Sequence, residues 1–342
     1  MVEYLNESPF VKFKPNTIIR SQGYSRTKQQ FVYEWKTDNL GFKNLDIVSS
    51  KGKVDIVAVG DSFTEGMGVA TEKTWPSILT ANGYLTYNLG VQGYAPIQFE
   101  GSLRKYGLQL KPKYIIIGYY SLTFGREQAF FDKNKAIRNK QFAGAIQSIV
   151  NAELRHEIRS QAKYVVSATY LFARSIVLYQ LRNSKIRRNT GVKDIYKKCA
   201  DEIWAVGSST FFIDEINKGS PEWKSTLFAF DNIIEMARQI NAKVILMYLP
   251  HRGVIYYKAA TGKNLPDRYF EKFEAYLLKQ YAQKNNITFL DPSERLIKYM
   301  ANLVDVATVS DLPYLELDGH MSNRGYELVA DEVLDYLQNQ QH

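Results

Sequence analysis

Short apolar runs rich in Val, Ile and Leu alternate with amphipathic segments along most of this chain. The runs cover residues 53–60, 112–121, 243–250 and 287–292. Such runs are typical of strands that are buried on both faces of a parallel sheet. A further strand-and-loop unit is predicted at residues 85–96. The alternation therefore favours an α/β fold with a doubly wound, mostly parallel sheet.

Helices are predicted where apolar residues recur at three- and four-residue steps. These segments are residues 71–79, 95–110, 221–242, 266–286, 293–303 and 323–340. Two parts of the chain depart from the pattern. Residues 1–50 are polar and turn-rich, and predict an extended N-terminal segment with short strands. Residues 126–220 have helical patterns without a clear strand, so we expect a helical insertion in an α/β domain that spans residues 51–342. A length of 342 residues fits this arrangement as well as it fits two domains.

Composition excludes several classes of protein. Hydrophobic residues make up 45% of the chain and charged residues 23%, which excludes a disordered chain, a collagen-like fibre and a polytopic membrane protein. The single cysteine, Cys199, excludes an intramolecular disulfide. Four scattered histidines give no metal-ligand spacing, so we expect no catalytic metal and no cofactor.

The net charge of +9 is mild, and much of it lies in residues 182–198. We interpret this cluster as a solvated loop, because the chain has no nucleic-acid-binding motif. The longest apolar stretch, residues 164–181, contains Arg174 and is short for a membrane span of about 20 residues. It predicts a helix packed on the main domain, with an interfacial helix as the alternative. We expect the bacterial envelope or periplasm if an anchor precedes Met1, and the cytoplasm otherwise. The oligomeric state stays open.

Reactive side chains follow the predicted strands, or in two cases precede the final helix, at the edge of an open α/β sheet where ligands bind. In chain order they are Asp61, Ser62, Asn88, Gln92, Gly93, Ser121, Thr123, His251, Asp318 and His320. An imidazole can remove the proton of a serine hydroxyl near neutral pH, and a carboxylate can orient that imidazole. Ser62 also lies at a strand-to-helix turn, where backbone N–H groups favour an oxyanion. The sequence thus predicts Ser62 as nucleophile, His320 as base and Asp318 as the orienting carboxylate.

Three segments resemble the blocks of the SGNH (GDSL-type) hydrolase superfamily. They are VDIVAVGDSFTEG, YNLGVQGY and LDGHMSNRGYELVA. The resemblance covers most of the chain except residues 126–220, and it is nearest to the longer bacterial members, many of which are envelope esterases or carbohydrate O-acyltransferases. It implies a flavodoxin-like three-layer fold. It also implies that the N–H of Gly93 joins that of Ser62 in an oxyanion hole.

The remaining residues of this edge are expected to contact substrate. They are Asp61, Asn88, Gln92, Ser121, Thr123 and His251. For Asp61 the alternative is a structural role, in which the carboxylate holds the turn through backbone hydrogen bonds.

The chain departs from the family pattern in its third block. The family has an Asn there whose amide donates to the oxyanion, whereas this segment reads GYYSLTFGRE and places Leu122 at that position. Losing one such donor costs about 100- to 1000-fold in rate. Either Ser121, Thr123, Asn88 or Gln92 replaces the donor, or the site is impaired. The final block also has Asp-x-His in place of Asp-x-x-His, with Glu316 as the alternative orienting residue.

Two classes of function follow. The first is a serine esterase or O-acyltransferase that acts on a carbohydrate or cell-envelope ester, with no nucleic-acid partner. The second is an impaired domain that binds a glycan or a partner without turnover. A lipase or thioesterase would use the same chemistry as the first class, with an apolar acyl pocket.

Overall fold

The computed structural model describes residues 2–5, 7–23, 31–121, 123, 221–264, 270–303, 312–315 and 319–340. The predicted insertion at 126–220 lies outside these ranges, as do Leu122, Glu316 and Asp318.

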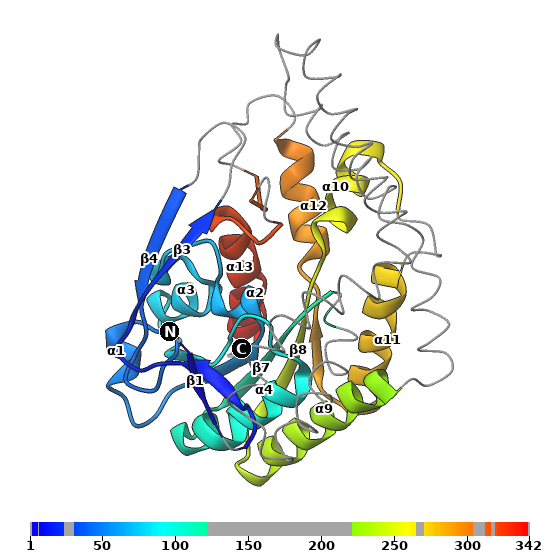
Figure 1. Ribbon diagram of the computed structural model, residues 1–342. Helices are drawn as coiled ribbons and strands as arrows, with labels where there is room; N and C mark the ends of the chain where they lie inside the picture. Colours follow the sequence, from blue (N-terminus) through cyan, green and yellow to red (C-terminus); the bar gives the residue numbers. More distant parts are fainter. Residues whose placement is uncertain are drawn as a thin grey trace, which may run out of the picture.

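A five-stranded parallel sheet forms the centre of the molecule (Figure 1). Its strands are β5 (Ile56–Gly60), β6 (Thr86–Asn88), β7 (Tyr114–Tyr120), β8 (Lys243–Leu249) and β9 (Thr288–Leu290). They lie in the order β6-β5-β7-β8-β9, and every pairing is parallel. This is the flavodoxin-like order, whose crevice opens beside the first strand at the carboxyl edge. The predicted α/β class is confirmed.

Helices cover both faces of the sheet (Figure 1). They include α2 (Ser62–Glu65), α3 (Trp75–Ala81), α4 (Pro96–Ser102), α9 (Pro221–Gln239), α10 (Arg252–Thr261), α11 (Phe270–Lys284), α12 (Ser293–Asn302) and α13 (Asn323–Asn339). Side chains of β5 alternate between two cores, as the two-residue period of a strand requires. Val57 and Val59 belong to the core that also holds residues of α4, α9 and α11. Ile56 and Ala58 belong to the core formed with α3, α10, α12 and α13.

Two predicted helices are interrupted in the structure. Residues 71–79 form a 3₁₀ turn, η1 (Thr71–Lys73), before α3 begins, because Thr74 caps α3 and Pro76 needs no N–H partner in the first turn. Residues 95–110 form α4 followed by a π-helical turn, η2 (Leu103–Gly107), and a 3₁₀ turn, η3 (Leu108–Leu110). In the described ranges, no helix combines the length and the apolar character that crossing a bilayer demands.

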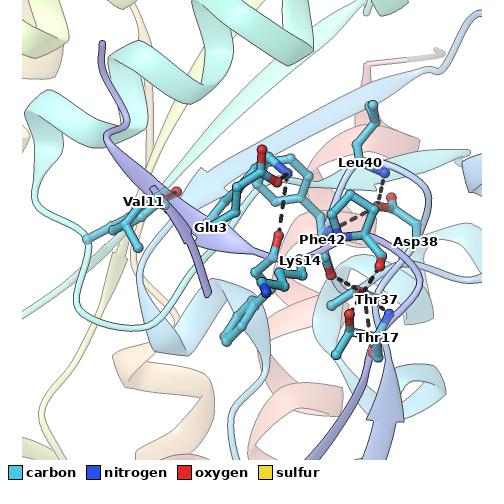
Figure 2. Close-up of polar contacts among 12 residues, drawn as sticks. Glu3, Val11, Lys14, Thr17, Thr37, Asp38, Leu40 and Phe42 are labelled. Atoms are coloured by element: carbon cyan, nitrogen blue, oxygen red, sulfur yellow. Dashed lines mark hydrogen bonds and ion pairs between the residues drawn. The ribbon is translucent and has the colours of Figure 1, made fainter. Parts of the chain in front are cut away.

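The N-terminal segment forms two antiparallel hairpins, β1 (Val2–Tyr4) with β2 (Val11–Phe13) and β3 (Ile18–Gly23) with β4 (Phe31–Lys36), and then the short helix α1 (Asp46–Ser49). Figure 2 shows the hydrogen bonds that hold the turn after β4 in place. The Asp38 carboxylate accepts from the N–H groups of Leu40 and Phe42, each at 2.9 Å. Thr37 donates its hydroxyl to the carbonyl of Lys14 at 2.7 Å and accepts from the N–H of Thr17 at 2.8 Å. The segment therefore packs as part of the domain, and Phe13 and Trp35 are buried in the first core.

Candidate active site

The turn between β5 and α2 presents Ser62 at the carboxyl edge of the sheet. Asp61 has an extended backbone and caps α2, because its Oδ1 accepts from the N–H of Phe63 at 3.0 Å. Ser62 is the first residue of α2 and is buried. Asp61 thus has the structural role that was the alternative to substrate contact.

His320 meets Ser62 from a distant part of the sequence. Its Nε2 lies 2.9 Å from the Ser62 Oγ, a hydrogen-bonding distance between residues 258 positions apart. The imidazole packs against the Phe63 ring, with the centroids 4.9 Å apart. Phe63 in turn stacks on Tyr120 at 3.7 Å. The structure brings together the predicted nucleophile and base, whereas the predicted orienting residue, Asp318, lies outside the described residues.

A cavity of about 180 Å³ opens at this pair. It is lined by Ser62, Phe63, Tyr120, His251, Arg252, Gly319 and His320. A larger open groove of about 640 Å³ lies along α12 and is lined by neither Ser62 nor His320. Arg295 in that groove is paired with Glu332 at 2.9 Å. We place the chemistry in the smaller cavity, because it holds the nucleophile and the base.

His251 lines this cavity, as expected of a residue that contacts substrate. Its Nδ1 accepts from the N–H of Gly253 at 3.2 Å and thereby caps α10. Burial lowers the pKa of the imidazole to about 4, and the neighbouring Arg252 charge adds to the effect. His251 is therefore neutral near pH 7.

Three other predicted contact residues form hydrogen bonds within the chain. Asn88 donates to the carbonyl of Thr64 at 2.9 Å and accepts from the N–H of Gly90 at 2.9 Å. The Ser121 hydroxyl donates to Glu274 at 3.0 Å, on the face of β7 that α11 covers. The Thr123 hydroxyl lies 3.4 Å from Oδ2 of Asp61. These contacts give the three side chains structural roles, and their contact with substrate stays a prediction.

The loop after β6 carries the expected oxyanion donor. Gly93 is exposed and has φ +78°, a backbone conformation that side chains other than glycine rarely adopt. Among the described residues, the N–H groups of Gly93 and Ser62 make no hydrogen bond. The preceding residue, Gln92, has an exposed side chain, and its N–H donates to Glu65 at 2.6 Å.

Sequence reasoning missed three residues that line the cavity, Phe63, Tyr120 and Gly319. Tyr120 could have been found from strand alternation, because it faces opposite to Tyr119 and Ser121 along β7. In the same described ranges, no three His, Cys, Asp or Glu side chains gather closely enough to hold a metal ion. The absence of a catalytic metal stays a prediction.

Comparison with known proteins finds similar folds at low identity. No family model matches the chain, and no curated protein matches it. Several solved structures do match the chain. A GDSL-like lipase from Bacteroides thetaiotaomicron VPI-5482 is 14% identical over 83% of this chain and 88% of its own, with a TM-score of 0.37. An esterase from a Pseudoalteromonas species is 14% identical over 84% and 97%, with a TM-score of 0.36. A catalytic mutant of an acetylxylan esterase from Geobacillus stearothermophilus is 10% identical over 83% and 94%, with a TM-score of 0.40.

Of these three proteins, one is named as GDSL-like and two are named as esterases. Their TM-scores are below 0.5, so the similarity carries no argument about what this chain does. The fold and the site rest on the chain's own residues.

Proposed function

We propose that this protein is a serine hydrolase of the SGNH type that cleaves ester bonds. The observation that carries the proposal is the 2.9 Å contact between the Ser62 Oγ and the His320 Nε2, at the mouth of a cavity on the carboxyl edge of the sheet. A serine hydroxyl becomes a strong nucleophile only when a base removes its proton, and this geometry supplies the base.

The reaction proceeds in two halves. The Ser62 Oγ attacks the ester carbonyl carbon while Nε2 of His320 accepts the hydroxyl proton. The N–H groups of Ser62 and Gly93 hold the oxyanion that forms. As the tetrahedral intermediate collapses, the ester C–O bond breaks and His320 returns the proton to the leaving alcohol. A second acceptor then releases the acyl group from Ser62. Asp318 is proposed to orient the imidazole, on the strength of the sequence motif.

The proposed substrates are small acyl esters of carbohydrates or of cell-envelope components. A cavity of about 180 Å³ suits a short acyl group, and the sequence resembles the longer bacterial esterases and O-acyltransferases. With water as the second acceptor the protein is an esterase, and with a sugar hydroxyl it is an O-acyltransferase. Adding an oligosaccharide to an assay with p-nitrophenyl acetate, and measuring its acetylation by mass spectrometry, distinguishes the two.

The function is tested with a fluorophosphonate probe, which labels activated serines. We expect labelling of the wild-type protein, with the adduct mapped to Ser62, and no labelling of Ser62→Ala. The control is Ser50→Ala, which removes an exposed serine hydroxyl that does not line the cavity and should label as the wild type does. Hydrolysis of p-nitrophenyl acetate by Ser62→Ala within a few-fold of wild type contradicts the proposal. Glycan binding that survives in Ser62→Ala, with no turnover by the wild type, favours the binding domain.

A further inference from the structure

Two charged side chains are buried directly behind the nucleophile. Glu65 is the last residue of α2, three positions after Ser62, and it is 2% exposed. Lys43 comes from the N-terminal segment and is 1% exposed. A buried charge is costly unless it is paired and hydrogen-bonded. The mechanism above uses neither residue, so the burial of these two charged side chains must have another explanation.

Lys43 is anchored to the segment that follows α2. Its Nζ donates to the carbonyl of Gly66 at 2.8 Å and to that of Val69 at 2.7 Å. It also lies over the Trp35 ring, 5.1 Å from the centroid. Burial lowers the pKa of Lys43 and raises that of Glu65, and the charge of each residue opposes the shift of the other. The charge of each side chain therefore favours the charged form of the other.

Glu65 reaches from α2 to the loop that carries Gly93. Its Oε2 accepts from the N–H of Gln92 at 2.6 Å, a charge-assisted contact on the peptide adjacent to Gly93. A Cβ built on Gly93 would meet no heavy atom within 4 Å, so packing against neighbouring side chains does not hold this residue. The hydrogen bond from Gln92 therefore restricts the direction of the following N–H.

Other contacts hold the same loop farther from Gly93. The N–H of Gly90 donates to Asn88, and the N–H of Val91 donates to the carbonyl of Gly60 at 3.2 Å. These contacts fix the start of the loop against β6 and β5. The N–H of Tyr94 donates to the carbonyl of Val91 at 3.2 Å and closes a turn around Gln92 and Gly93, and the contact with Glu65 holds this turn to α2.

We propose that Glu65 is a positioning residue that sets the N–H of Gly93 relative to Ser62 and so completes the oxyanion hole. The inference rests on the proposed ester hydrolysis. Glu65 does not touch the reacting atoms. It acts through the main chain of Gln92, and it couples the N-terminal segment to the site through Lys43.

The test compares three substitutions of Glu65. Glu65→Gln keeps an oxygen that can accept from Gln92, so we expect kcat within about 5-fold of wild type. Glu65→Leu has no acceptor, and Glu65→Asn is one methylene too short to reach. For both we expect kcat to fall by about 30- to 100-fold, somewhat less than the loss of a whole oxyanion donor, with KM within about 3-fold. The control is Glu72→Gln, which removes an exposed carboxylate whose charge also acts on Lys43 but which does not touch the loop.

Rates are expressed per mole of Ser62 titrated by the fluorophosphonate probe, so that any misfolded fraction cancels. Per-site kcat values of Glu65→Leu and Glu65→Asn within about 3-fold of wild type overturn the proposal, because removing one oxyanion donor costs far more. A loss in Glu65→Gln as large as that in Glu65→Leu also overturns it, because the acceptor would then not be the feature that matters. Hydrolysis retained by Ser62→Ala is a separate result, which overturns the proposed function itself.

Discussion

The nucleophile and the base come from two regions that are built differently. Ser62 is the first residue of α2, directly after strand β5, and hydrogen bonds made by the side chains of Asp61, Asn88 and Glu65 hold the backbone around it. His320 lies outside the sheet, on a turn where Tyr314 pairs with Met321 and the N–H of Leu315 donates to the His320 carbonyl at 2.7 Å.

Because the two regions are built differently, substitutions in them should affect folding stability and activity to different extents. Contacts around Ser62 serve the fold and the site together, so changing them should affect both. The His320 imidazole is half-buried, and its described contacts lie mainly toward Ser62 and Phe63. Changing it should therefore affect activity far more than folding.

The largest expected effect is on the base. His320→Ala should lower kcat by about 1000- to 10 000-fold, because Ser62 then has no group to remove its proton. The melting temperature should stay within a few degrees of wild type. Ester hydrolysis assays and thermal unfolding measure the two quantities. If unfolding shifts as much as it does for substitutions beside Ser62, the two regions do not differ in the way we infer.

A smaller effect distinguishes two glycines of the loop beside Ser62. In Gly90→Ala the new Cβ would lie 2.4 Å from the backbone nitrogen of Glu65, so we expect a loss of about 2–4 kcal/mol of stability from overpacking. In Gly93→Ala the Cβ meets open space, and the positive φ alone costs about 1 kcal/mol. Urea denaturation measures both. Equal losses would show that the loop is not packed against α2 as described.

The smallest effect concerns the wall of the cavity at His251. Its pKa of about 4 in the folded protein lies below the ordinary value of 6.5, so between these values the unfolded chain binds the proton more readily. The contribution of His251 to the free energy of unfolding is fully present above about pH 6.5. It is lost as the pH falls toward 4, by about 1–2 kcal/mol.

His251→Asn keeps a side-chain oxygen that can cap α10 and removes the titrating group. We therefore expect the variant to lose less stability than wild type between pH 7 and pH 4.5, as measured by denaturant unfolding at both values. Identical pH dependence in the two proteins would mean that the imidazole is protonated as easily in the fold as in the unfolded chain.

Much of this architecture could be predicted from the sequence. Buried parallel strands are recognised as apolar runs, and the residues directly after them, such as Ser62, share one edge of the sheet. His320 follows no strand, and its pairing with Ser62 across 258 positions was predicted from the motif ahead of the last helix. Side-chain direction was harder to predict. Ser121 lies at that edge but faces Glu274, whereas its neighbour Tyr120 lines the cavity.

The pairing of Lys43 with Glu65 could not be predicted, because it depends on how the N-terminal segment packs. Nothing local in the sequence distinguishes a lysine that is buried over Trp35 from a solvated one. Long-range contacts of this kind emerge only when the elements are in place.

The position of Lys43 also sets where this domain can be cut or recombined. A chimaera that begins at β5 would contain the buried Glu65 carboxylate without the opposing charge of Lys43. The Gly93 loop would then be held by a buried carboxylate whose charge is not compensated. The smallest transferable unit therefore begins before β4, which supplies the Trp35 ring, and includes the turn that brings Lys43 inward. By this measure β4 is an internal part of the module, although the apolar strand pattern starts only after it.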